Sequence, residues 1–122
     1  MRRLKDLLRL ARLHRDLDLA VLADAVAQSE QARHAKERAS GALDRLRGAL
    51  EEDPRHALDW PGSGEAALKH GRLRVAQAAA SLARAEAELA TPFEKARRGV
   101  ARAEVLEQLL SDLRSTKRRR IK

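Results

Sequence analysis

Apolar residues recur at gaps of three and four along the chain from Leu4 to Leu50, and the first proline is Pro54. This spacing places the apolar residues on one face of a helix, and nothing in the segment ends that helix. The second half is clearest, because strict 4-3 spacing marks the seam of a left-handed coiled coil at Ala32, Ala35, Ala39, Ala42, Leu46 and Ala49. The sequence therefore predicts one long helix over residues 4–52.

The first half of this helix carries another apolar stripe, which we assign to the same seam: Leu7, Leu10, Leu17 and Val21. Its phase joins the later seam through an extra step near Ala25, which we interpret as a stutter. Composition agrees with an extended helical fold, because the 122 residues include one Phe, one Trp and no Tyr. The bulky side chains that fill a globular core are missing, whereas Ala, Leu and charged residues are typical of coiled coils.

The helical pattern stops over residues 53–64, where residues that end helices and turn chains gather: Pro54, Pro61, Gly62, Ser63 and Gly64. We predict a loop there, then a second helix over residues 65–117 and a basic tail over residues 118–122. The second helix keeps one heptad register at Leu68, Val75, Ala79, Leu82, Leu89, Phe93, Ala96, Val100, Ala103, Leu110 and Leu113. Three further positions of that register are charged: Arg72, Glu86 and Glu107.

One local stop signal interrupts the second helix. Thr91, Pro92 and Glu94 match a helix N-cap, a proline at the first helical position and a capping-box glutamate. A chain reversal at this point would give a three-helix bundle. The seam nevertheless passes from Leu89 to Phe93 to Ala96 in phase, which favours a continuous helix with a kink at Thr91-Pro92.

Folding the chain about its loop tests whether the two helices match. Antiparallel neighbours then pair along the whole length: Leu50 with Leu68, Ala39 with Ala79, Ala25 with Phe93, Val21 with Ala96, Leu7 with Leu110, and Leu4 with Leu113. Phe93 falls opposite a run of alanines, so that a large residue meets small ones. We therefore predict an all-α fold, a single long two-helix antiparallel coiled-coil hairpin.

The net charge of +8 is concentrated near the two ends of the chain. Basic residues occupy the first turns, at Arg2, Arg3, Lys5, Arg9, Arg12 and Arg15, and the end of the chain, at Arg114, Lys117, Arg118, Arg119, Arg120 and Lys122. Antiparallel pairing brings both clusters to one end, which would attract an acidic channel, a phosphate backbone or an anionic surface. The alternative is a solvated, solubilising tail. No aromatic residue lies among these side chains to stack on bases, so nucleic-acid binding would be non-specific.

Residues that could carry chemistry are scattered. The four histidines, His14, His34, His56 and His70, do not pair at metal-ligand spacing, and a helical hairpin offers no enclosed pocket to the acidic run Glu51, Glu52 and Asp53. We predict no catalytic site, no metal and no cofactor. Trp60 in the loop is either a partner-binding anchor or a residue that folds back over the end of the hairpin. Close helix approach or local flexibility would explain the helical glycines, Gly41, Gly48, Gly71 and Gly99.

The absence of cysteine excludes a disulfide framework and fits a reducing compartment, for which the cytoplasm is the default. Charged residues interrupt the apolar stretch in residues 1–13, so no signal peptide is predicted. No apolar run approaches the length of a membrane span.

Several segments together resemble a known family. They are the opening Leu4-Lys5-Asp6-Leu7-Leu8-Arg9-Leu10-Ala11-Arg12, the long Ala-rich arms, the central Pro/Gly loop and the closing Ala101-Arg102-Ala103-Glu104-Val105-Leu106-Glu107-Gln108-Leu109-Leu110. With them the chain resembles the FliJ-type flagellar export proteins and the similar YscO-like stalk proteins of injectisomes. The resemblance covers nearly the whole chain and rests on pattern and length.

This resemblance implies a central stalk of a type III export ATPase, a two-helix coiled coil whose paired termini enter the ATPase hexamer. It implies that the other end of the hairpin faces the cytoplasmic domain of the export gate, and that the protein promotes coupling of ATP hydrolysis and proton-motive force to export. The protein would be cytoplasmic and peripheral to the inner membrane, without a small-molecule substrate. The residues facing the ATPase, here named the basic tip, would be Arg2, Arg3, Lys5, Arg9, Arg114, Lys117, Arg118, Arg119 and Arg120.

Two other classes of function share these features. A helical adaptor or export chaperone that offers an exposed heptad face to a partner helix would show the same periodicity. A basic, non-specific polyanion-binding protein would show the same net charge.

Overall fold

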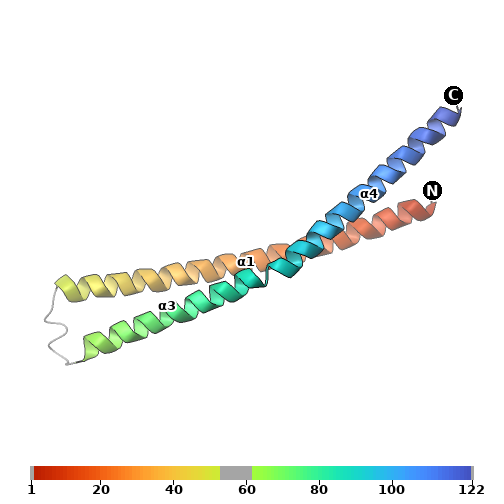
Figure 1. Cartoon of the computed structure of the whole chain (residues 1–122). Helices are drawn as coiled ribbons and strands as arrows, with labels where there is room; N and C mark the ends of the chain where they lie inside the picture. Colours follow the sequence, from red (N-terminus) through yellow and green to blue (C-terminus); the bar gives the residue numbers. More distant parts are fainter. Residues whose placement is uncertain (1, 53–61, 122) are drawn as a thin grey trace. The chain divides into compact units, whose positions relative to one another are not determined.

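The computed structural model describes residues 2–52 and 62–121, which contain three α-helices and no strand (Figure 1). Helix α1 spans Arg2–Glu52, α3 spans Ser63–Ala87 and α4 spans Ala90–Ile121. The prediction of an all-α fold is confirmed, and the helices pack against each other.

The chain divides into two compact units. The first, here named the terminal unit, combines residues 1–25 with residues 88–122, so that the first half of α1 packs with α4. The second, the inner unit, covers residues 26–87 and packs the rest of α1 with α3. Helix α1 is continuous through both units.

The face of α1 that packs against the other helices follows one heptad register without a stutter. The buried and half-buried positions along it are Leu4, Leu8, Ala11, Arg15, Asp18, Leu22, Ala25, Ser29, Ala32, Ala39, Leu43, Leu46 and Leu50. Lys36 is exposed and is the one exception to the spacing, because the residue before it, Ala35, is half-buried in its place. The predicted seam was therefore correct at Ala32, Ala35, Ala39 and Leu46. It was wrong at Ala42 and Ala49, which are exposed, because the following residues, Leu43 and Leu50, pack instead.

The predicted seam in the first half of α1 is wrong. Leu7, Leu10 and Val21 are more than half exposed and Leu17 is 64% exposed, whereas Leu8 and Ala11 are each 5% exposed. The leucine stripe gave the wrong register because the face that packs includes two charged residues, Arg15 and Asp18. Both are only half-buried. The long aliphatic stem of Arg15 packs while its guanidinium reaches water, and the short side chain of Asp18 lies at the edge of the contact near Gly99.

Helix α4 supports this placement with small residues. Its buried residues are Ala96, Gly99, Ala103 and Leu110, and Ala103 is 1% exposed. The predicted column through Ala96, Ala103 and Leu110 is confirmed. Phe93, predicted to face alanines, is instead 58% exposed, and Leu113, predicted to pair with Leu4, is 48% exposed.

Two close contacts show that α4 runs antiparallel to the first half of α1. A Cβ atom on Gly99 would lie 3.3 Å from Arg15 Cα and 3.4 Å from Asp18 Oδ2. Closer to both chain ends, Arg12 Nη2 donates to Glu107 Oε1 at 2.7 Å and Arg12 Nε donates to the same oxygen at 3.1 Å. The contact made by the earlier residue of α1, Arg12, is therefore with the later residue of α4, Glu107, as antiparallel packing requires.

The inner unit has the same antiparallel arrangement. A Cβ atom on Gly71 of α3 would lie 2.9 Å from Leu43 Cδ1, and Arg33 Nη2 lies 3.6 Å from Glu86 Oε1. Close helix approach thus accounts for Gly71, as it does for Gly99. Gly48 has no such role, because a Cβ atom there would meet nothing within 4 Å.

The second arm was predicted as one continuous helix with a kink at Thr91-Pro92, but the structure divides it into α3 and α4 a few residues earlier. Glu88 and Leu89 form a turn between α3 and α4, and the Phe93 N–H donates to the Leu89 carbonyl at 3.0 Å. Leu89, not Thr91, is therefore the N-cap residue of α4. Proline explains the position of the break, because Pro92 has no N–H to donate to the Glu88 carbonyl and its ring would clash with that group.

The remaining helix boundaries differ from the predicted ones by a few residues. Helix α3 begins at Ser63, two residues early, after Gly62, which has a φ of 88° and accepts a hydrogen bond from the Ala66 N–H at 2.9 Å. The predicted basic tail is wrong, because α4 continues through Arg120 to Ile121. Basic side chains in a last turn stabilise a helix because their positive charge is attracted by the negative end of the helix dipole.

Candidate partner-binding surfaces

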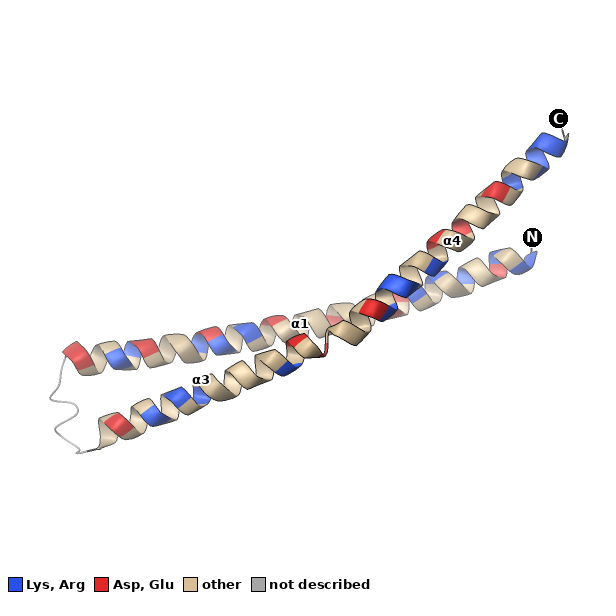
Figure 2. Ribbon diagram, viewed as in Figure 1, with Lys and Arg blue, Asp and Glu red and all other residues tan. Residues whose placement is uncertain are grey.

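The nine residues of the basic tip all lie in the terminal unit and are all exposed. Four come from the first turns of α1 and five from the last turns of α4 (Figure 2). Among residues 2–52 and 62–121, none of the nine forms an ion pair with a carboxylate of another described residue. Within the described ranges, therefore, no carboxylate pairs with these charges.

Packing brings the two basic clusters together in part. Lys5 and Arg9 of α1 line a shallow hollow of about 340 Å³ with Arg114 of α4, over a floor that includes Leu8 and Leu110. A neighbouring hollow is lined by Arg114 and Arg118 together with Arg12. Arg118, Arg119 and Arg120 in the last turn of α4 are exposed, and they lie beyond Leu110, the last residue of that helix described as buried.

Charge is distributed very unevenly between the two units. The terminal unit holds sixteen Lys and Arg against nine Asp and Glu, a net charge of +7. The inner unit holds ten against nine, a net charge of +1. Nearly all of the excess positive charge therefore belongs to the unit that contains both ends of the chain.

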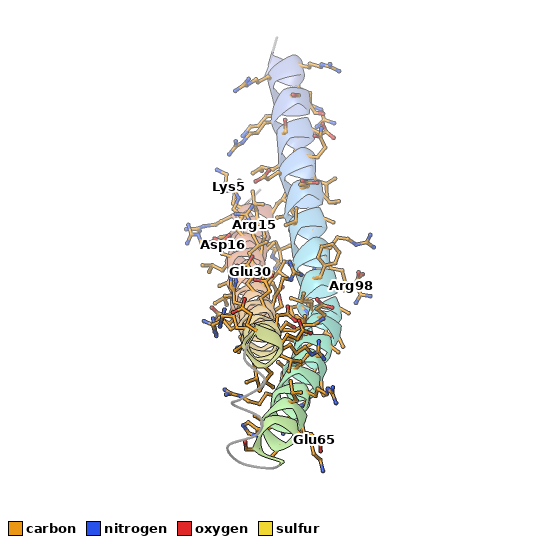
Figure 3. The ribbon with its side chains drawn as sticks, turned by 90° about the vertical axis from the view of Figure 1, so that its left-hand side faces the viewer. Lys5, Arg15, Asp16, Glu30, Glu65 and Arg98 are labelled. Atoms are coloured by element: carbon orange, nitrogen blue, oxygen red, sulfur yellow. The ribbon has the colours of Figure 1, made fainter. Side chains whose placement is uncertain are left out.

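The other ion pairs of the terminal unit are local and lie at its surface. Arg97 and Arg98 both pair with Glu94 within one turn of α4, and Arg15 pairs with the adjacent Asp16. Arg98 extends from α4 on the side away from α1 (Figure 3). Such exposed pairs add little to stability.

A second surface is apolar. Five large apolar residues along α1 are more than half exposed: Leu7, Leu10, Leu13, Leu17 and Val21. On α4, Val105, Leu109 and Leu113 are also exposed. We name the α1 residues the leucine face. The sequence pattern found four of them but assigned them to the helix–helix seam.

The inner unit carries a groove of about 590 Å³ between α1 and α3. Its floor includes Ala39, Ala42, Leu43, Leu46 and Gly71. Three arginines also line it: Arg38, Arg45 and Arg74. Sequence reasoning missed this site, although the repeat of Ala-x-x-Arg at residues 35–38 and 42–45 was a visible signal.

Groups that could carry chemistry remain dispersed. His14, His34 and His70 are exposed, and His34 Nδ1 lies 3.5 Å from Glu37 Oε2. Within the described ranges no three His, Asp or Glu side chains are grouped as metal ligands. Glu51 and Glu52 are exposed at the end of α1, whereas Asp53, His56 and Trp60 lie outside the described residues.

None of the helices in the described part of the chain is long and apolar enough to cross a membrane. Comparison with known proteins found no matching family model, no matching curated protein and no matching solved structure.

Proposed function

We propose that this chain is the non-enzymatic stalk of a flagellar or type III export ATPase, and that its basic tip enters the ATPase ring and promotes hydrolysis and export. The observation that carries this proposal is the charge of +7 on the terminal unit, to which both ends of the chain contribute. A pore lined by carboxylates concentrates and orients such a unit.

We infer further that the two units form one coiled-coil hairpin. Helix α1 runs unbroken through both units, and α3 and α4 each run antiparallel to the part of α1 that they contact. A hairpin of this kind ends in a tip only two helices wide. That width suits a stalk that occupies the centre of a ring.

The chemistry of the tip supports contact with acidic groups. Arg supplies seven of its nine side chains, and guanidinium groups bind carboxylates through paired, directional hydrogen bonds. The apolar floor at Leu8 and Leu110 beneath Lys5, Arg9 and Arg114 offers a surface that excludes water from such pairs. The tip therefore combines steering charge with a place for a partner side chain.

ATP hydrolysis by the export ATPase of the same organism tests the proposal. The tip variant carries Arg118→Glu, Arg119→Glu and Arg120→Glu. The control variant carries Lys36→Glu, Arg47→Glu and Arg72→Glu, which make the same change in net charge at exposed positions of the inner unit. We expect the wild-type chain and the control to stimulate hydrolysis and hexamer formation, and the tip variant to lose both effects. Equal stimulation by the two variants would refute a role for the tip.

The leucine face favours a second candidate, an adaptor or export chaperone that binds a partner helix. Exposed leucines at helical spacing are the usual recognition surface for an amphipathic helix. An adaptor would keep its partner in the tip variant and lose it when Leu10 and Leu17 are both replaced by Glu. The stalk proposal expects ATPase stimulation to fail in the tip variant, so the two variants separate the candidates.

A further inference from the structure

The groove in the inner unit exists because small residues line the place where α1 and α3 meet. Ala39 and Ala42 of α1 and Gly71 of α3 leave space above Leu43, which is 7% exposed. At Gly71, α3 comes so close to α1 that an added Cβ atom would lie 2.9 Å from Leu43 Cδ1. The result is a groove of about 590 Å³ with an apolar floor.

Arginines line this groove from both helices. Arg38 and Arg45 lie on α1 and Arg74 lies on α3, and no Asp or Glu is among the described residues that line the groove. In the part of the chain that the structure describes, none of the three arginines takes part in an ion pair. This positive surface stands out because the inner unit as a whole is close to neutral.

Four acidic residues in the second half of α1 follow a different line along the helix. They recur every seven residues at Glu30, Glu37, Asp44 and Glu51. Because Glu37 and Asp44 directly precede Arg38 and Arg45, they lie about 100° around the helix from those arginines. Asp44 lies 3.9 Å from Arg47, and Glu37 lies beside His34, so their nearest basic partners are not the groove arginines.

Spacing along the groove matches a helix. Arg38 and Arg45 are seven residues apart, about 10.5 Å along α1, which is one heptad. A helix laid against α1 and α3 would place small or apolar residues over Ala42 and Leu43. Carboxylates that recur every seven residues on its flanks would meet Arg38 and Arg45 on one side and Arg74 on the other.

We propose that this groove binds an acidic amphipathic helix of a partner protein, which adds a third helix to the inner unit. A second copy of the chain does not fit. Two-fold self-association would set groove against groove and so oppose like charges. The acidic line of α1 also has arginines beside it, Arg38 and Arg45 on one side and Arg33 and Arg47 on the other.

This proposal does not depend on the proposed function, because the groove residues lie in the inner unit and the basic tip lies in the terminal unit. Loss of groove binding with full ATPase stimulation would leave the stalk intact. The reverse result would leave the groove intact.

The test uses the full chain and a fluorescent synthetic peptide of about four heptads, with Ala and Leu on its inner face and Glu on both flanks. Two matched peptides replace every flanking Glu by Gln or by Lys. Fluorescence anisotropy should show binding of the Glu peptide. The Gln peptide should bind with an affinity at least about tenfold lower, and the Lys peptide should not bind. Added salt should weaken the Glu complex.

The groove variant carries Arg38→Glu, Arg45→Glu and Arg74→Glu, and should bind the Lys peptide in preference to the Glu peptide. The control variant with Lys36→Glu, Arg47→Glu and Arg72→Glu should bind the Glu peptide like the wild type. Ala42→Phe fills the floor without altering charge and should also weaken Glu-peptide binding. Circular dichroism establishes that each variant keeps its helicity.

Three results would overturn the proposal. The first is equal affinity for the Glu and Gln peptides, and the second is unchanged Glu-peptide binding by the groove variant. The third is displacement of the Glu peptide by a single-stranded oligonucleotide at the same concentration of negative charge. That outcome would identify the groove as a general anion-binding surface, not a site for a helix.

Discussion

Gly99 of α4 lies against the backbone of α1 at Arg15, where an added Cβ atom would come within 3.3 Å of the Arg15 Cα atom. This close approach explains how a charged residue occupies the helix–helix seam. Because Gly99 has no side chain, the stem of Arg15 packs beside it while the guanidinium remains at the surface, 3.2 Å from Asp16. The terminal unit therefore depends on small residues of α4 as much as on leucines of α1.

A series of three glycine replacements tests this close approach. Gly99→Ala should lower the free energy of unfolding by about 1 kcal/mol or more, because the backbone of α1 has to move away. Gly48→Ala should raise it by about 0.5–1 kcal/mol, since nothing lies near that position and alanine is the better helix former. Gly71→Ala should fall between them, because its nearest neighbour is the movable end of the Leu43 side chain.

Thermal denaturation followed by circular dichroism gives the order of the three melting temperatures. The expected order from highest to lowest is Gly48→Ala, Gly71→Ala and Gly99→Ala. Stabilisation by Gly99→Ala comparable to that of Gly48→Ala would contradict close packing between α1 and α4 at Arg15.

Adjacent leucines of α1 test the register of the seam. Leu8 is 5% exposed and Leu7 is 53% exposed, although both are leucines in the same turn. Leu8→Ala should cost about 2–3 kcal/mol of stability. Leu7→Ala should cost less than about 0.5 kcal/mol, because it removes little buried surface. Chemical denaturation of both variants gives their free energies of unfolding. An equal loss in the two variants would contradict the register in which Leu8 packs and Leu7 is exposed.

The helical class and most helix boundaries could be predicted from the sequence because proline, glycine and the 3-4 periodicity act locally. The register could not be predicted in the first half of α1, where two stripes compete. One consists of Leu7, Leu10, Leu17 and Val21, and the other includes Arg15 and Asp18. Hydrophobicity alone selects the first stripe. The second packs because Gly99 of α4 fits closely against Arg15 and Asp18, and that fit depends on residues distant in sequence.

The candidate surfaces also differ in how far the sequence alone reveals them. The basic tip could be recognised from the sequence because its charges form runs at the two ends of the chain. The groove was visible in the sequence only in part, as the Ala-x-x-Arg repeat of α1. Arg38 and Arg45 become one surface with Arg74 only when α3 packs beside α1. Trp60, the other residue that the sequence suggested for partner binding, lies outside the described residues and remains a prediction.

Replacements at Thr91 and Pro92 test which residue causes the break between α3 and α4. The break follows either from the missing N–H of Pro92 or from capping of α4 by Thr91. Pro92→Ala restores an N–H that can donate to the Glu88 carbonyl, so we expect greater helicity and a higher Tm. Thr91→Ala should leave stability within about 0.5 kcal/mol, because Leu89 is the N-cap residue. A loss near 1 kcal/mol for Thr91→Ala would instead indicate that Thr91 caps α4 in solution.

The Arg12–Glu107 ion pair joins α1 to α4 at an exposed position. A double-mutant cycle with Arg12→Ala and Glu107→Ala should give a coupling energy of about 0.2–1 kcal/mol, which is the usual range for surface pairs. Repeating the cycle in about 1 M salt should reduce the coupling, because screening is then effective over a few ångströms. A coupling that does not change with salt would contradict an exposed pair.

The central claim is that the two ends of the chain form one basic surface, and the distance between Arg9 and Arg114 tests it most directly. The chain has no cysteine, so Arg9→Cys and Arg114→Cys introduce the only two sites for spin labels. Pulsed electron paramagnetic resonance, with unlabelled chain added to remove distances between molecules, should give one population below about 25 Å. Helix α4 has 32 residues and is about 48 Å long at 1.5 Å per residue. A main population beyond about 40 Å would separate the two labels by nearly the length of that helix and would show that the two ends do not meet.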